Sequence, residues 1–238
     1  VQKLACWATA VTTADVPRTV LERARLQHLH QATLIGRVPD TGPWDGLLRL
    51  APRRGPAVLA DGRRTSGFAA ARIHSAKAAW TDRLDHILGG ATGVGGVTAA
   101  WGASKGRDLG ELLTATVVAN EVSGRIGSAL MIGPHYGAGA GWVYASSGAI
   151  AAGRLTGLDA DQMAHALALA ISGAGIIPRA VAAGQGRSMA VASAVGAGVE
   201  AVRLAGAGVH GPLDILEAAG GLLESGCWLP LPHAFTGL

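Results

Sequence analysis

The sequence is 238 residues long, which is enough for one large domain or two small ones. Hydrophobic residues make up 49% of it and charged residues 15%, so its composition excludes intrinsic disorder. The net charge of +4 comes from scattered basic residues rather than from a dense basic patch, which argues against a nucleic-acid partner. Sparse arginines are better suited to binding an anionic small molecule than to binding a nucleic acid.

The helical patterns follow one another along most of the chain, and almost no strand alternation interrupts them. Residues 37–67 form the exception, an irregular connector rich in proline, glycine and arginine, with a short extended piece at 57–60. We therefore expect an all-α fold in a single helical domain that spans residues 1–238. The helices are predicted at 4–11, 17–36, 68–80, 92–103, 109–130, 142–158, 160–172 and 188–204, and Pro212 and Asp214 are expected to open a short last helix.

Two of these helices begin with an acidic N-cap. Asp108 is followed three residues later by Glu111, which is the spacing of a capping box. Asp159 and Gln162 repeat that spacing at the next-but-one helix. Both starts are therefore well specified by the local sequence.

The stretch 126–153 contains no Asp, Glu, Lys or Arg and is long enough to span a membrane. It also contains a proline, a histidine and many glycines, and it is poor in the large apolar residues of spanning helices. We expect a buried loop and helix here, no membrane partner and a cytoplasmic location. Cys6 and Cys227 lack metal-ligand spacing, and reduced thiols are the simpler alternative to a disulfide.

His135 is the leading candidate for chemistry because a glycine-rich loop presents it directly before a helix. Glycines allow a ligand to come close, and a position near a helix start disfavours the cationic form of the ring. A neutral histidine there suits acid–base work. The alternative is a core histidine whose nitrogens bond to backbone carbonyls.

Further candidates lie in two other segments. Arg187 and Ser188 stand at the start of a helix, where free backbone N–H groups favour the binding of anions. An arginine at this position can also form two parallel hydrogen bonds to a carboxylate. Asp82, Asp85 and His86 form a second group in which a carboxylate can orient a histidine. Solvated surface charges and a polar helix end are the structural alternatives. No histidine pair has zinc-ligand spacing, so we expect neither metal nor organic cofactor.

Several segments, in this order, resemble the MmgE/PrpD family, which contains 2-methylcitrate dehydratase and cis-aconitate decarboxylase. The segments that carry the resemblance are Asp15-Val16-Pro17, Gly106-Arg107-Asp108-Leu109, Asn120 to Gly127, Gly133-Pro134-His135, Gly148 to Asp159, His165 to Ala170 and Gly206 to Pro212. The resemblance implies an all-helical domain, here without the family's α+β lid, and it implies a dimer. It also marks His135 as a site residue.

The resemblance fails at two site positions. The histidine of the family's His-Pro-Gly turn corresponds to Ala91, and the lysine of its Lys-x-Leu-His motif corresponds to Arg187. The resemblance therefore implies a divergent, cofactor-independent lyase or isomerase rather than the usual dehydratase or decarboxylase. Its acid–base residues would be His135, with His86 and Asp82 assisting.

Such an enzyme would act on an anionic or carbonyl-bearing small molecule, for instance at a ring-forming or elimination step of a biosynthetic pathway. Arg187 and Ser188 would bind the substrate, and Tyr136, Trp80 and Trp142 would line an apolar part of the site. A homodimer is expected because many Ala/Gly helix faces need covering. The alternative function is a non-catalytic helical subunit that pairs with a fuller homologue.

Overall fold

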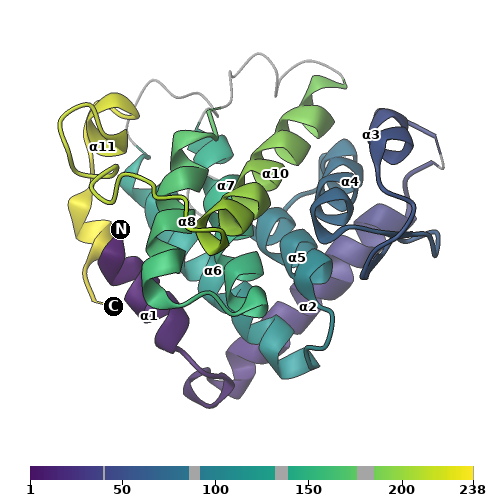
Figure 1. Cartoon of the computed structure of the whole chain (residues 1–238), viewed down its shortest axis with the longest axis horizontal. Coiled ribbons are helices and arrows are strands. Elements are labelled where there is room, and N and C mark those ends of the chain that lie inside the picture. The colour runs from purple at the N-terminus through teal and green to yellow at the C-terminus, as the bar shows by residue number, and fades with distance from the viewer. Residues whose placement is uncertain (40, 86–91, 132–138, 176–184, 238) are drawn as a thin grey trace.

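Helices make up most of the computed structural model, which describes residues 1–39, 41–85, 92–131, 139–175 and 185–237 (Figure 1). The first part of the chain forms α1 (Gln2–Ala10), the 3-10 helix η1 (Thr13–Asp15), α2 (Arg18–Gly36), α3 (Asp45–Leu50), α4 (Gly67–Trp80) and α5 (Thr92–Ala103). The second part forms α6 (Leu109–Ala129), α7 (Gly139–Thr156), α8 (Ala160–Ser172), α10 (Gly186–Gly206), α11 (Leu222–Ser225) and the 3-10 helix η2 (Pro232–Phe235). The predicted all-α fold class is confirmed.

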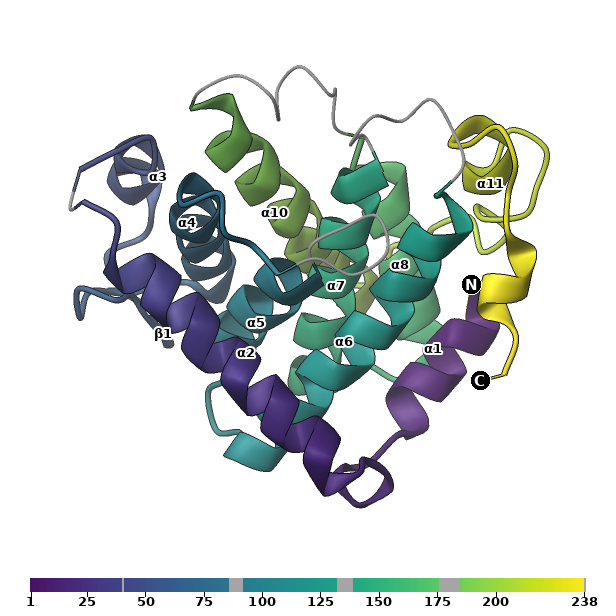
Figure 2. The ribbon, with the colours of Figure 1, turned by 180° about the vertical axis from the view of Figure 1, so that it is seen from behind.

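Helix α7 forms the centre of the molecule. It packs against α5, α6, α8 and α10, and between Gly139 and Leu155 every residue except Trp142 and Arg154 is buried. The absence of charged side chains before Arg154 is what permits this central position, because an unpaired buried charge would be costly. Helix α4 packs on α5 and α10, α1 packs on α8, and α2 crosses the back of α5 and α6 (Figure 2).

The helix directions divide the bundle into two ends. Gly67 at the start of α4 touches Gly102 near the end of α5, so these two helices are antiparallel. Gly148 of α7 faces Val195 of α10, and both helices then continue toward a shared cavity. One end of the bundle therefore combines the end of α4 with the starts of α5, α7 and α10. We call it the α10-start end.

The core is built from small side chains, which lets backbones approach closely. At the crossing of α7 and α10, a Cβ atom on Gly198 would lie 2.1 Å from the carbonyl oxygen of Ala145 and 2.9 Å from the backbone nitrogen of Ala149. No side chain fits at that distance. The high glycine content of the sequence therefore has a direct packing role at this crossing.

Both predicted capping boxes are present. The backbone N–H of Glu111 donates to the Asp108 carboxylate at 2.8 Å, and that of Gln162 donates to Asp159 at 2.8 Å. Arg154 adds a cap that the local sequence does not reveal. Its guanidinium donates to the carbonyl oxygens of Ala8 and Val11 at the C-terminal end of α1, where a positive charge is favourable.

Two sequence predictions need correction. The connector 37–67 contains helix α3, which is anchored by the fully buried Trp44, as well as a two-stranded antiparallel hairpin of β1 (Ala57–Val58) and β2 (Arg64–Thr65). Pro212 and Asp214 do not open a helix. Their carbonyls close isolated turns, to Ile215 at 3.1 Å and to Ala218 at 2.8 Å, and the next helix is α11, beginning at Leu222.

Within the described residues, α10 is long and apolar enough to cross a membrane by length and composition. In the structure, however, α10 packs against α4, α7 and α8, and 56% of its most apolar window is buried. The same composition is found in core helices of globular proteins, and α10 occupies such a position here.

Candidate active site at the α10-start end

Arg187 and Asp82, two of the candidate residues, meet at the α10-start end. Arg187 stands in the first turn of α10, and Asp82 follows the C-cap of α4. Their side chains form an ion pair, which raises the pKa of the guanidinium. The Asp82 side chain is 75% exposed and its φ of 53° lies in the left-handed region, which aspartate tolerates better than most residues.

Ser188 follows Arg187 but points into the protein. It is fully buried, and its hydroxyl has no hydrogen-bond partner in the part of the chain that the structure describes. Unpaired buried hydroxyls are unusual, because desolvation of the group is not compensated. The hydroxyl therefore retains hydrogen-bonding capacity that the described residues do not use.

The two tryptophans expected in the site differ in position. Trp80, in the last turn of α4, is 42% exposed and meets the buried Trp44 ring edge-on, with centroids 6.0 Å apart. Trp142 lies in the first turns of α7 and is partly buried against the main core. Both tryptophans lie in terminal turns of helices at the α10-start end, so they are placed where they could form an apolar wall of the site.

Tyr144 is a further candidate residue at this end, and the sequence analysis did not name it. It is 3% exposed, and burial raises the pKa of its hydroxyl to about 12. The nearby charge of Arg187 lowers this pKa and that of Asp85 raises it, so Tyr144 lies within electrostatic reach of both residues. At neutral pH the hydroxyl is protonated and can donate a hydrogen bond.

The described residues that bond to the Asp85 carboxylate are amides and not cations. Its carboxylate accepts hydrogen bonds from the side-chain amides of Gln27 and of Gln31, the second at 2.8 Å. The amide of Asn120 in turn donates to Gln27 at 2.8 Å. Gly93, in the first turn of α5, makes room for the group, since a Cβ there would lie 2.3 Å from an Asp85 oxygen. Helices α2, α5 and α6 thus converge on a single carboxylate.

Asp85, Gln27, Gln31 and Asn120 form what we call the amide cluster. Two of its polar atoms have no hydrogen-bond partner in the described residues. The side-chain oxygens of Gln31 and Asn120 are buried without a hydrogen-bond partner in the described residues. Asp85, Gln27 and Asn120 also line a groove of about 410 Å³ between α2 and α6. The cluster is therefore reachable from a cavity and retains unused hydrogen-bonding capacity, as expected of a binding site.

His30 anchors the segment that contains Asp82 and Asp85. Its Nε2 lies 2.9 Å from the carbonyl oxygen of Arg83, and because a carbonyl only accepts, the Nε2 atom must carry the proton. This bond fixes the backbone between Asp82 and Asp85. The orientation of both carboxylates is therefore partly set from α2.

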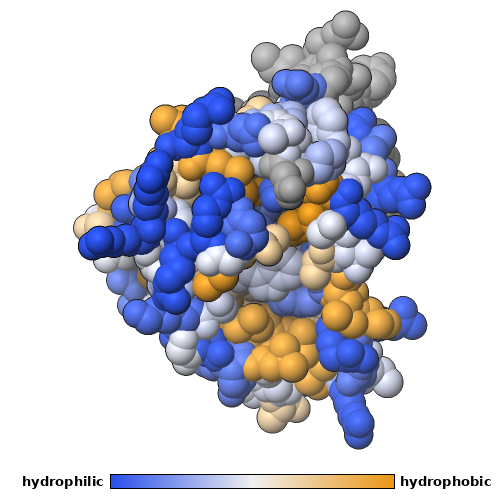
Figure 3. Space-filling model, turned by 90° about the vertical axis from the view of Figure 1, so that its right-hand side faces the viewer, coloured by the Kyte–Doolittle hydropathy of each residue, from blue (hydrophilic) through white to orange (hydrophobic). Residues whose placement is uncertain are grey.

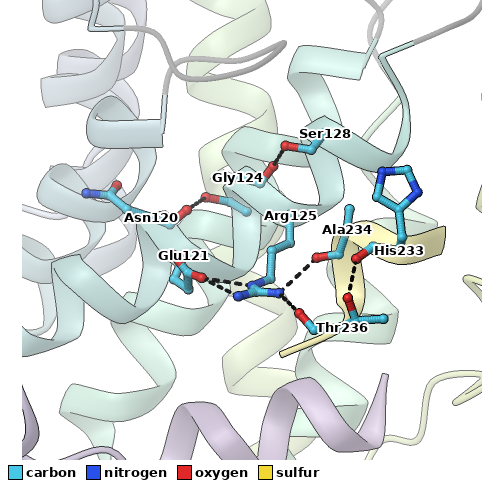
Figure 4. A network of polar contacts seen from close by, with 9 residues as sticks. Asn120, Glu121, Gly124, Arg125, Ser128, His233, Ala234 and Thr236 are labelled. Atoms are coloured by element: carbon cyan, nitrogen blue, oxygen red, sulfur yellow. Dashed lines mark hydrogen bonds and ion pairs between the residues drawn. The ribbon is translucent and has the colours of Figure 1, made fainter. Parts of the chain in front are cut away.

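Three predicted site residues, His86, His135 and Tyr136, lie outside the described residues. Arg125 of α6 is engaged with Glu121 and with the C-terminal segment. It donates to Glu121 at 2.6 and 2.8 Å and to the carbonyl oxygens of Ala234 and Thr236 at 2.9 and 2.7 Å (Figure 4). It thereby fastens the segment around η2 to α6.

The described residues contain no group of three or more His, Cys, Asp or Glu side chains with metal-binding geometry. What this end of the bundle brings together is a carboxylate held by amides, a protonated phenol, an arginine and a buried hydroxyl. These groups can hold an anion and move a proton.

Comparison with known proteins identifies the chain at the level of the family. The model of the MmgE/PrpD N-terminal domain matches residues 2–227. The chain belongs to the MmgE/PrpD family. The matched part of this MmgE/PrpD chain extends from α1 through α11. A search of curated proteins finds no match. The family includes dehydratases and other lyases.

The amide cluster was hard to foresee. Gln27 and Asp85 are 58 positions apart, and Gln27 and Asn120 are 93 apart. The one local signal was the spacing of Gln27 and Gln31, because residues four apart share a face of a helix. Two glutamines on a face of α2 that turns toward the protein indicate a buried polar partner.

Proposed function

We propose that the α10-start end carries an acid–base site for a lyase or isomerase reaction on a small anionic or carbonyl-bearing molecule, without a cofactor. The observation that carries the proposal is the convergence of Asp85, Tyr144 and Arg187, which lie close enough for both charges to shift the pKa of the phenol. A buried phenol with a raised pKa beside charged groups is typical of catalytic sites.

In this proposal Arg187 binds a carboxylate or carbonyl oxygen of the substrate. Its partner Asp82 is highly exposed, and an exposed ion pair is worth only about 0–1 kcal/mol, so an incoming anion can displace it. Arginine also has enough donors to hold two carboxylates. Asp82 is then the resting partner of Arg187, and its role is in substrate access.

Asp85 is suited to be the base. It would take the proton from a carbon next to the carbonyl or carboxylate, so that the C–H bond breaks and its electron pair moves onto the substrate oxygen. Arg187 and the O–H of Tyr144 would stabilise that oxygen. Expulsion of a group from the neighbouring carbon completes an elimination, and return of the proton completes an isomerisation.

We retain the proposed acid–base roles of His135 and His86. We also retain the proposal that an apolar part of the substrate contacts Tyr136, Trp80 and Trp142. We also propose a homodimer and a cytoplasmic location. In support of a dimer, Val20, Leu26 and Leu29 of α2 are exposed although they are hydrophobic. Such side chains gather at interfaces between subunits.

Substrate binding can be tested with a panel of 2- and 3-hydroxy di- and tricarboxylates in titration calorimetry. Loss of a charge-assisted hydrogen bond should weaken binding of the best ligand by about tenfold or more in Arg187→Gln. Arg54→Gln, at an exposed arginine that lines neither this end of the bundle nor a described cavity, is the matched control and should bind like the wild type. Equal affinity of Arg187→Gln and wild type would remove Arg187 from the site.

A further inference from the structure

A second cavity lies at the end of the bundle opposite to the candidate active site. Its volume is about 770 Å³, which is within the range of small-molecule sites. It lies where α4 begins and where α5 and α7 end, beside the last turns of α10 and under the connector. The residues that matter below are Phe68, Arg72, Ala103, Lys105, Arg107 and Arg203.

The lining of this cavity is mostly aliphatic. Leucine, alanine, valine and proline side chains from the connector, α5, α7 and α10 form it, with Phe68 as its one aromatic residue. Figure 3 views the molecule from the side of α3 and α4, and hydrophobic surface is visible there in a hollow bordered by hydrophilic residues. A lining of this kind favours an apolar ligand body without specific polar groups.

The charged side chains of the lining all have the same sign. They are Arg72, Lys105, Arg107 and Arg203, and no Asp or Glu is among the described residues that line the cavity. Arg107 and Arg203 are already paired, with Glu111 at 2.9 Å and Glu200 at 2.8 Å. In the described part of the chain, Arg72 and Lys105 form no ion pair. These two cations are available to an anionic ligand.

Arg72 is held in place before any ligand arrives. Its aliphatic stem packs on Gly196 of α10, where a Cβ would lie 2.9 Å from the Arg72 Cδ. Its guanidinium lies over the Phe68 ring, 5.4 Å from the centroid. This contact orients the guanidinium but does not use its N–H donors, because an aromatic face does not accept the paired hydrogen bonds that a carboxylate accepts.

We propose that this cavity binds an amphipathic anion, with an aliphatic body against the lining and a carboxylate-type head group against Arg72 and Lys105. A small polar anion would leave the apolar lining uncovered, and a neutral hydrocarbon would leave both cations unpaired. The site is separate from the proposed active site and does not depend on that proposal.

Decanoate is a suitable probe, compared by titration calorimetry with decan-1-ol and with acetate on the 238-residue chain. Decanoate should bind with one-to-one stoichiometry, and the alcohol and the short acid should bind at least about tenfold more weakly, since each lacks one half of the recognition. Arg72→Gln should weaken decanoate binding by about tenfold.

Arg54→Gln is the matched control, because Arg54 is an exposed arginine on the same connector but outside the lining. It should leave decanoate binding unchanged. Ala103→Phe fills part of the cavity without changing its charge and should also weaken binding. Circular dichroism melting curves confirm that each variant is folded.

Three outcomes would overturn the proposal. The first is absence of decanoate binding to the folded wild-type chain, and the second is equal affinity of the wild type and Arg72→Gln. The third is a stable homodimer, seen by sedimentation, whose interface protects Ala103 and Arg72 from solvent, because a second copy would then be the occupant.

Discussion

Asp82 and Asp85 are three residues apart and have opposite environments. Asp82 points into solvent and pairs with a cation, whereas Asp85 is enclosed by neutral amides beside the first turn of α5. Among the described residues Asp85 has no cationic partner, and such a carboxylate can accept a substrate proton without first breaking an ion pair. For this reason we propose Asp85 rather than Asp82 as the base, although the sequence made both of them candidates.

The partly buried His28 and the buried His74 are held in the neutral form. His28 accepts a hydrogen bond from the Trp101 indole at 3.0 Å, so its proton is on Nε2, which donates to Thr116 at 2.9 Å. His74 lies edge-on to the same Trp101 ring, with centroids 5.6 Å apart. Burial is the main cause that lowers the pKa of each to about 4.

These pKa values predict acid lability. In the unfolded chain a histidine titrates near the model value of 6.5, so the unfolded state binds protons that the folded state excludes. The stabilisation is present above pH 6.5 and is lost as the pH falls from there through 4. Each histidine contributes up to about 3 kcal/mol to this loss.

Urea unfolding of wild type and His74→Phe between pH 7 and pH 4.5 measures this effect. Because His74 Nδ1 has no partner in the described residues, phenylalanine removes the titration without breaking a bond there. The variant should lose less stability on acidification. His210→Gln, at an exposed histidine, should behave like the wild type. A slope in His74→Phe equal to that of the wild type would contradict the assignment.

At the scale of elements, the sequence predicted those helices whose ends are encoded locally. The capping boxes at Asp108 and Asp159 are examples, since all the bonding groups lie within four residues. Helix α3 was missed because it depends on the burial of Trp44 against residues far away in the sequence. Pro212 and Asp214 carry start signals, but the turns that follow them end at Gly220, whose φ of 74° lies in the left-handed region.

The crossing of α7 and α10 gives a test of small-residue packing. Gly198→Ala places a Cβ against the backbone of α7, where nothing flexible can give way. We expect a loss of about 1–3 kcal/mol or more in the free energy of unfolding. In Gly206→Ala, on the same helix, the new Cβ would have an ordinary contact of 3.5 Å with Leu158, and the effect should be neutral or slightly stabilising. Denaturant unfolding of both variants makes the comparison, and equal stabilities would contradict the packing argument.

At the scale of the whole molecule, the helix directions place two cavity-forming regions at opposite ends. One contains the groove beside Asp85, Gln27 and Asn120, and the other is apolar with a basic rim. The order of family segments along the sequence was sufficient to predict the family and the helical fold. The side chains that build each end come from helices distant in sequence, so their grouping required the structure.

The central claim is that Asp85 removes a proton from a substrate carbon at the α10-start end. The direct measurement is exchange of that carbon-bound hydrogen for deuterium in D₂O, followed by NMR, for the carboxylate that binds best in the Arg187 titration. Asp85→Asn keeps the size of the side chain and should slow exchange by about a hundredfold or more. Asp61→Asn, at an aspartate paired with Arg63, is the control and should exchange at the wild-type rate. Exchange in Asp85→Asn at the wild-type rate would contradict the claim, and binding without any exchange in the wild type would favour a non-catalytic helical subunit.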